Sequence, residues 1–188
     1  MTTKIIDNTI VSLDFESNSL NLMKILNEFY SIETTNSVYN ETINGFDPNL
    51  TRIYYSNIKI NNLSSNIRYV KLYQYFQNRY PYLHDGEVSA FLLSLINFHL
   101  KDKPYYFISD DNKMRKVCLT QLNKDKLFLK IINKPEFIPN FVGTIGIIKH
   151  LFKRNFINKA EMKKIIFGIR KSSFRITNDL INILEDLL

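Results

Sequence analysis

Residues 84–111 read HDGEVSAFLLSLINFHLKDKPYYFISDD. The segment 88–98 is apolar nearly all round, which predicts a helix that is buried on every side. The residues His84-Asp85-Gly86-Glu87 mark its start, and Asp85 is the expected N-cap. A short apolar strand, Tyr105–Ile108, follows and ends in acidic residues. A buried helix followed by a buried strand is typical of an α/β protein with a parallel sheet.

The segments before this stretch alternate in the same way. Clustered apolar and β-branched residues predict a strand over Lys4–Leu13, and helical spacing predicts a helix over 22–29. A short extended piece around Ile32 and a helix that carries Val38 and Glu41 follow. Alternation of polar and apolar residues over 52–63 indicates a half-exposed strand or hairpin, and 68–80 reads as a helix that stops near Pro81.

The segments after it are mainly helical. An apolar stripe from Met114 to Leu122 predicts a helix, and 127–132 reads as a strand within an irregular excursion. Phe141 onward predicts a strand end, a cap at Thr144 and an amphipathic helix, and two more helices follow at 159–168 and 179–188. We find no repeats and no Gly/Ser linker, so we expect one domain over 1–188, with 141–188 as a basic helical C-terminal extension.

The composition excludes several classes of protein. Of 188 residues, 45% are apolar and 23% charged, which excludes wholesale disorder, collagen and a coiled coil. Cys118 is the only cysteine, which excludes a disulfide framework and a cysteine-based zinc cluster and fits a reducing compartment. No apolar run approaches the roughly 18 residues of a membrane span, and no secretory signal opens the sequence. We therefore expect a cytoplasmic protein with no membrane partner.

The net charge of +7 is concentrated near the C-terminus. Residues 149–175 hold nine Lys or Arg and one acidic residue, whereas the last thirteen residues hold three acidic residues and no Lys or Arg. Such a concentration favours a polyanion such as nucleic acid. A solvated helix face in a lysine-rich sequence is an equally good interpretation.

The acidic residues that could carry chemistry are few. Asp7, Asp110 and Asp111 lie in or at the ends of apolar strands, and Glu41 and Glu87 lie near helix starts. Ligands of an open α/β sheet collect at the carboxyl ends of its strands, so these side chains could converge on one cleft. Clustered carboxylates become favourable around Mg²⁺ or Mn²⁺, and such ions support phosphodiester hydrolysis.

Each of these acids also has a structural interpretation. Asp7 could cap a turn, Glu87 could be a first-turn acid favoured by the helix dipole, and Glu41 could be an exposed helix residue. The pair Asp110-Asp111 could cap a helix. Other chemistry is poorly supported. The histidines His84, His99 and His150 lack the spacing of zinc ligands, and Cys118 lies on an apolar helix stripe, which disfavours a thiol nucleophile. For the tyrosines, core packing is favoured over base stacking; these are Tyr54, Tyr55, Tyr73 and Tyr75.

Five segments occur in an order that is similar to one known family. They are IIDNT (5–9), VYNET (38–42), LHDGEVSAFLLSL (83–95), ISDDNKMRKVC (108–118) and VGTIGIIKHLFKRNFI (142–157). Together they resemble the PIN-domain family, within it a bacterial and archaeal subfamily related to the toxins of VapBC-type toxin-antitoxin pairs. The resemblance covers nearly the whole chain and is strongest at Gly86-Glu87, at Asp110-Asp111 with Arg115, and at residues 143–146.

The resemblance implies a PIN-like three-layer α/β/α fold with a central, mainly parallel sheet. It implies that Asp7, Glu41, Glu87 and Asp111 correspond to the four metal-site acids, with Asp110 as a neighbouring candidate, and that Mg²⁺ or Mn²⁺ is the cofactor. The implied substrate-binding residues are Thr9, Ser109, Lys113, Arg115 and Lys116. The chain departs from many PIN nucleases in having Glu87 where they have Asp, and Cys118 where a small Ala is usual.

The function implied is a metal-dependent endoribonuclease that cuts single-stranded or looped RNA. If the toxin relation extends to function, an antitoxin is the expected partner and a homodimer the expected state. The alternatives are a catalytically silent PIN-like module that binds nucleic acid or protein, and a DNA-directed PIN-like nuclease. We see no helical arch or helix-hairpin-helix for duplex DNA, and a doubly wound nucleotide-binding domain would need a phosphate loop that is absent.

Overall fold

The computed structural model describes residues 2–17, 21–173 and 176–188. Within these residues, five parallel strands form one sheet in the order β3-β2-β1-β4-β5. The strands are β1 (Thr3–Ile6), β2 (Ser31–Thr35), β3 (Lys59–Asn61), β4 (Tyr105–Ile108) and β5 (Phe141–Val142). In the centre, Thr3 is in register with Ser31 and with Tyr105. The expected α/β fold with a parallel central sheet is confirmed.

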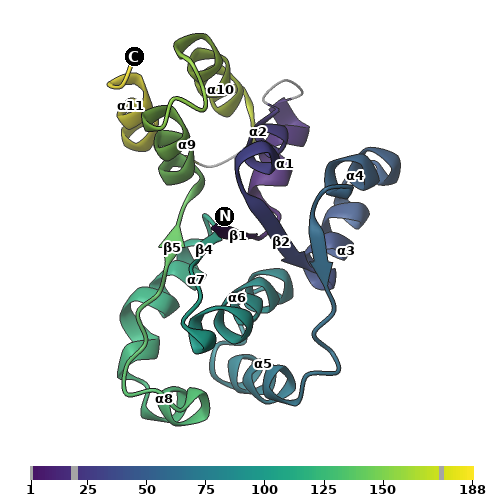
Figure 1. Cartoon of the computed structure of the whole chain (residues 1–188), viewed down its shortest axis with the longest axis vertical. Coiled ribbons are helices and arrows are strands. Elements are labelled where there is room, and N and C mark those ends of the chain that lie inside the picture. The colour runs from purple at the N-terminus through teal and green to yellow at the C-terminus, as the bar shows by residue number, and fades with distance from the viewer. Residues whose placement is uncertain (1, 18–20, 174–175) are drawn as a thin grey trace.

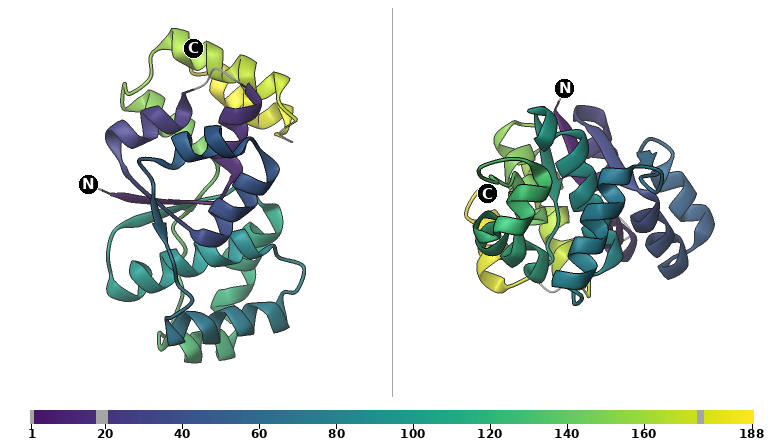
Figure 2. Two further views of the ribbon diagram at one scale, coloured as in Figure 1. Left: turned by 90° about the vertical axis from the view of Figure 1, so that its right-hand side faces the viewer. Right: turned by 90° about the horizontal axis from the view of Figure 1, so that it is seen from below.

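Helices cover both faces of this sheet and make three layers (Figures 1 and 2). One layer contains α5 (Ile67–Arg79), α6 (Asp85–Asn97), α7 (Asn112–Lys116) and α8 (Lys126–Ile132). The other contains α1 (Thr9–Ser17), α2 (Leu22–Phe29), α9 (Thr144–Lys153), α10 (Lys159–Lys171) and α11 (Asn178–Glu185). The helices α3 (Asn36–Gly45) and α4 (Pro48–Tyr55) lie beside β2 and β3, and short 3₁₀ or π turns span His99–Lys101, Val117–Gln121 and Leu122–Lys124.

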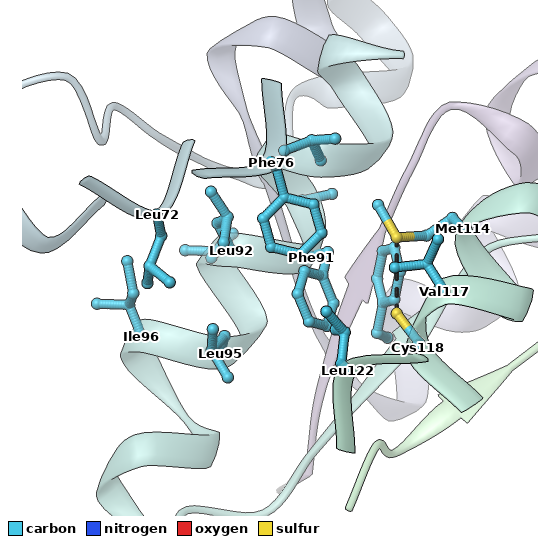
Figure 3. Packing of buried hydrophobic residues seen from close by; sticks show 14 of the residues in the cluster. Leu72, Phe76, Phe91, Leu92, Leu95, Ile96, Met114, Val117, Cys118 and Leu122 are labelled. Atoms are coloured by element: carbon cyan, nitrogen blue, oxygen red, sulfur yellow. Dashed lines mark hydrogen bonds between the residues drawn. The ribbon is translucent and has the colours of Figure 1, made fainter. Parts of the chain in front are cut away.

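Alternating residues of the central strands supply two hydrophobic cores. Ile5 and Phe107 point into the core beneath α6, whereas Ile6 and Ile108 point into the core beneath α9. Ten residues of α6 are buried. Figure 3 shows Phe91 of α6 between Phe76 of α5 and Met114 of α7. The prediction of a helix buried on every side is confirmed.

The predicted strand Lys4–Leu13 is wrong in its second half. The strand ends at Ile6, and α1 begins at Thr9. The Asp7 carboxylate accepts a hydrogen bond from the Thr9 backbone N–H at 2.8 Å, a local turn that starts the helix. The β-branched residues that suggested a strand are therefore in a helix because their burial against the second core outweighs their local preference.

Two further predicted strands are helical. In 52–63, α4 occupies the first part and only Lys59–Asn61 is a strand, and 127–132 belongs to α8. In each case an aspartate caps the helix. The Asp47 side chain accepts hydrogen bonds from the backbone N–H groups of residues 49 and 50, and the Asp125 side chain accepts from those of residues 127 and 128. Pro48 at the first turn further favours α4.

The ends of three helices also differ from expectation. The N-cap of α6 is His84 rather than Asp85, and the N-cap of α9 is Gly143 rather than Thr144. For the helix predicted over 22–29 the sequence offers Ser17 or Ser19 as the cap, but the N-cap of α2 is Asn21. Ser19 lies outside the described residues, as do Phe174 and Arg175 of the basic segment. In the described part of the chain, no helix is both long enough and apolar enough to cross a membrane.

Candidate acidic site at the carboxyl edge of the sheet

The sheet has a topological switch point between β1 and β4. From β1 the chain adds β2 and then β3 on one side, and β4 and β5 on the other. In such sheets the crevice for a ligand opens at the carboxyl ends of the two central strands. Asp7 follows β1 and Ser109 follows β4, so both lie at this crevice. Their loops are held together by the Asp7 backbone N–H, which donates to the Ile108 carbonyl at 3.2 Å.

Asp7 is a buried carboxylate at the centre of this edge. Its side chain accepts hydrogen bonds from the hydroxyls of Ser109 and Thr9 and from the Thr9 backbone N–H. Burial raises the pKa of Asp7 to about 6, despite these hydrogen bonds, and the nearby charge of Asp110 acts in the same direction as burial. Thr9 and Ser109, predicted as substrate-binding residues, are therefore placed as the groups that hold Asp7.

Ser109 connects two of the predicted acids. Its hydroxyl contacts the Asp7 carboxylate and accepts a hydrogen bond from the Asp111 backbone N–H at 3.2 Å. The Asp111 carboxylate accepts from the backbone N–H of Met114 and so caps α7. Ser109 therefore links the Asp7 carboxylate to the backbone of Asp111, which explains the hydroxyl residue two positions before this acid.

Glu41 reaches the site from α3. Its Oε1 accepts a hydrogen bond from the backbone N–H of Gly86 at 2.8 Å, at the first turn of α6. A Cβ on Gly86 would lie 2.2 Å from Glu41 Oε2, so glycine is needed at this position for the carboxylate to fit. Burial raises the pKa of Glu41, and the Gly86 hydrogen bond partly opposes the rise.

Glu87 is the acid most strongly affected by the others. Burial is the largest cause that raises its pKa to about 8, and the charges of Asp111, Asp7 and Glu41 raise it further. A long hydrogen bond of 3.4 Å from the His84 backbone N–H acts in the opposite direction. Asp7, Glu41 and Asp111 thus come from three other segments and lie close enough to Glu87 to affect its pKa.

Asp110 contacts the start of α9. Both of its carboxylate oxygens accept from the backbone N–H of Thr144 at 3.0 Å, at the first turn of α9. Gly143 makes room for it, because a Cβ there would lie 2.6 Å from Asp110 Oδ1. Burial raises the pKa of Asp110, while the charge of Arg115 lowers it. Asp110 therefore anchors the first turn of α9.

The donor set suits a hard divalent cation that keeps much of its water. Among the described residues, no three His, Cys, Asp or Glu side chains are arranged to hold one ion directly. After burial, the charges of Asp111, Asp7 and Glu41 are what raises the pKa of Glu87, so an added positive charge would be favourable beside this residue. Mg²⁺ is commonly held by one or two carboxylates with water completing its shell, and this mode fits the arrangement.

The predicted cationic residues lie on or beside α7. Arg115 is exposed, sits near Gly143 and covers the Phe141 ring at 5.8 Å from its centroid. Lys113 and Lys116 are exposed, and the described part of the chain gives them no ion-pair partner. These three residues place positive charge close to the loop that carries Asp111.

Two hydroxyl residues at the site were missed from the sequence. Thr35, at the end of β2, caps α3 and shares a hydrogen bond of 2.6 Å with Ser89 of α6. The Ser89 hydroxyl also bonds to the Gly86 carbonyl. This pair ties α3 to α6 and so fixes Glu41 relative to Glu87. The available signal was Ser89 itself, which is, with Ser94, one of two polar residues in the apolar run 88–96.

Cys118 and two of the tyrosines belong to the cores. The Cys118 thiol is buried against Met114 Sδ at 3.6 Å, and burial raises its pKa. Tyr55 and Tyr75 are buried, and their hydroxyls bond to Thr42 and Asp125.

No protein-family model, curated protein or solved structure matches this chain. A functional assignment therefore rests on the residues and geometry of the acidic edge.

Proposed function

We propose that the protein is a PIN-type, Mg²⁺- or Mn²⁺-dependent endoribonuclease. The observation that carries this proposal is the position of Glu87 at the switch point of a parallel sheet, where burial and the charges of Asp111, Asp7 and Glu41 together raise its pKa to about 8. A structural role for each acid alone would not require them to face one another. Placing like charges together is costly unless a cation is bound among them.

Asp7, Glu41, Glu87 and Asp111 would hold the cation, some of them through water. A cation bound there would supply an activated water and would neutralise charge on a phosphate. Ser109 holds Asp7 and the Asp111 backbone in place, and the Gly86 N–H holds Glu41. Arg115, with the exposed Lys113 and Lys116, would position the phosphate backbone of the substrate.

RNA is the proposed substrate because the chain is basic and resembles PIN ribonucleases. The net charge of +7 favours a polyanion, and the exposed lysines of α7 adjoin the acids. The relation to toxins extends the proposal to an antitoxin as partner and to a homodimer.

The experiment is cleavage of a mixed-sequence, single-stranded RNA with Mn²⁺ or Mg²⁺. The variants Asp7→Asn and Asp111→Asn remove the charge, and asparagine at position 111 keeps the ability to cap α7. The matched control is Asp102→Asn, at an exposed position remote from the four acids. We expect metal-dependent cutting by wild type and control, and a loss of at least 100-fold in both site variants.

Other outcomes separate the alternatives. Equal cutting by every variant would mean a contaminating nuclease and would refute the assignment of the site. RNA binding without cutting under either metal would favour the catalytically silent module. A parallel reaction with single-stranded DNA tests the DNA-directed alternative, which preferential cutting of DNA would support.

A further inference from the structure

A second group of charged residues lies at the opposite, amino-terminal edge of the sheet. Lys4 is the second residue of β1, and its backbone is in register with Tyr106 of β4. The helix α9 runs back from the acidic edge, so its last turn, with His150, returns to the amino-terminal edge. Tyr30, just before β2, completes this group with Arg154.

Lys4 is unusual because it is buried without an anionic partner. The residue is 3% exposed, and within the described residues it has neither an ion pair nor a side-chain hydrogen bond. Its ammonium group instead lies over two rings, 3.7 Å from the Tyr106 centroid and 4.4 Å from the Tyr30 centroid. The ammonium keeps contact with solvent, because the only fully buried and unpaired polar side-chain atom described is a threonine oxygen elsewhere.

The groups around Lys4 are cationic. The His150 ring lies 6.3 Å from the Tyr30 ring, and the charges that act on His150 are those of Lys4 and Arg154. Burial lowers the pKa of Lys4 to about 8, and no carboxylate counteracts it. The negative end of the α9 dipole explains basic residues in its last turn, but it does not explain a buried lysine contributed by β1.

We propose that Lys4, His150 and Arg154, with the rings of Tyr30 and Tyr106, form an exosite that binds a phosphate of single-stranded RNA. The assignment to RNA rests on the proposed nuclease function, whereas binding of phosphate rests on the cations alone. The cations supply the charge that phosphate needs. Tyr106 is 44% exposed, and its ring offers a stacking surface that a base would use and an acidic peptide would not.

The exosite and the acidic site are on opposite edges of the sheet, at the two ends of α9. A single strand that reaches both would cross the face of the molecule beside this helix. The phosphate at the amino-terminal edge would then hold the strand while the carboxyl edge cuts it. We therefore expect the exosite to affect RNA affinity and leave the chemistry at the acids unchanged.

The test measures binding of a labelled single-stranded RNA by fluorescence anisotropy in EDTA, where no cutting occurs. Lys4→Met keeps the length of the buried side chain, and Arg154→Gln changes an exposed residue. The control is Lys130→Met, an exposed lysine on α8 at the far end of the molecule. Each site variant should weaken binding about three- to tenfold and lower the slope of log affinity against log salt by about 0.7 to 1, with the control unchanged.

Competition identifies what is bound. Inorganic phosphate and a ribonucleoside 5′-monophosphate are each added to the wild-type complex, and stronger competition by the mononucleotide indicates that the base contributes through Tyr106. Equal affinity and salt slope in wild type, Lys4→Met and Arg154→Gln would overturn the exosite, as would displacement by polyglutamate but not by RNA. Failure of the nuclease proposal looks different: the RNA binds through the exosite, but no metal supports cutting.

Discussion

At the scale of single residues, Glu87 carries the electrostatic strain of the acidic site. Its folded-state pKa of about 8 lies above the ordinary value of about 4.3, so the folded protein binds more protons than the unfolded chain between these values. The free energy of unfolding must therefore fall as pH rises across this window. Asp7, with a pKa of about 6, adds to the fall in its lower part.

We predict that Glu87→Gln stabilises the metal-free protein at pH 7 and flattens this pH dependence. The amide keeps an oxygen that accepts from the His84 N–H, and because it is neutral in the folded and the unfolded chain, folding no longer requires the uptake of a proton at this position. Because the side chain is partly exposed, we expect a gain of about 1 kcal/mol. Urea unfolding in EDTA from pH 5 to 8 measures it, and a fall in stability as steep as that of wild type would contradict the prediction.

Asp14 is a second buried carboxylate, but its role is structural. Its oxygens accept from the backbone N–H groups of Leu22 at 3.0 Å and Met23 at 2.7 Å, so it holds the first turn of α2. Asp14→Ala should lower the free energy of unfolding by about 2 kcal/mol, because two buried donors lose their acceptor, and Asp14→Asn should cost less. Denaturant unfolding measures both, with the exposed Glu136→Ala as control; an equal effect of the control would refute the role.

At the scale of elements, two helices begin with a glycine that makes room for a carboxylate from another segment. Gly86 of α6 admits Glu41, and Gly143 before α9 admits Asp110. The backbone N–H groups of these first turns then bind the carboxylates. The two glycines thus allow Glu41 and Asp110 to bind the first turns of these helices.

We predict that Gly86→Ala removes RNA cleavage with little loss of stability. The new Cβ would displace the flexible end of Glu41, so the cost in unfolding free energy should stay below about 1 kcal/mol, while the carboxylate leaves its position. The matched control is Gly45→Ala at the end of α3, where a Cβ meets nothing within 4 Å. Metal-dependent cleavage and thermal unfolding are compared, and full activity in Gly86→Ala would show that the position of Glu41 is unimportant.

The errors in predicting elements from the sequence have one physical origin. Strands are predicted at 4–13 and 127–132, and a strand or hairpin from polar-apolar alternation at 52–63, yet each segment contains helical residues. Aspartate side chains that bond to backbone N–H groups start these helices, and tertiary burial then decides the conformation of the residues that follow. By contrast, α6 and β4 were predictable because α6 is buried along residues 88–96 and three of the four residues of β4 are buried.

At the scale of the whole molecule, topology explains how much of the site was predictable. In a parallel sheet, residues after each strand share an edge, so the approach of Asp7 to Asp111 follows from the order of strands. The engagement of Asp110 with α9 could not be predicted, because it depends on which way one short side chain turns between two neighbouring acids. The Thr35–Ser89 bond was hidden for the same reason, since it joins residues 54 positions apart.

The whole molecule should also respond to the cation that its acidic edge is proposed to bind. A ligand that binds only the folded state stabilises it, so Mn²⁺ at 100 times its dissociation constant should add about 2.7 kcal/mol, or about 5–10 °C in the midpoint of thermal unfolding for a chain of this size. Protons compete with the cation for Glu87, whose pKa is about 8, so the shift should be larger at pH 8 than at pH 6. Asp7→Asn should remove most of the shift, and Asp102→Asn should keep it. A wild-type midpoint that does not move with Mn²⁺ or Mg²⁺ at either pH would contradict a cation site among these acids, because a cation that binds only the folded protein must raise the midpoint.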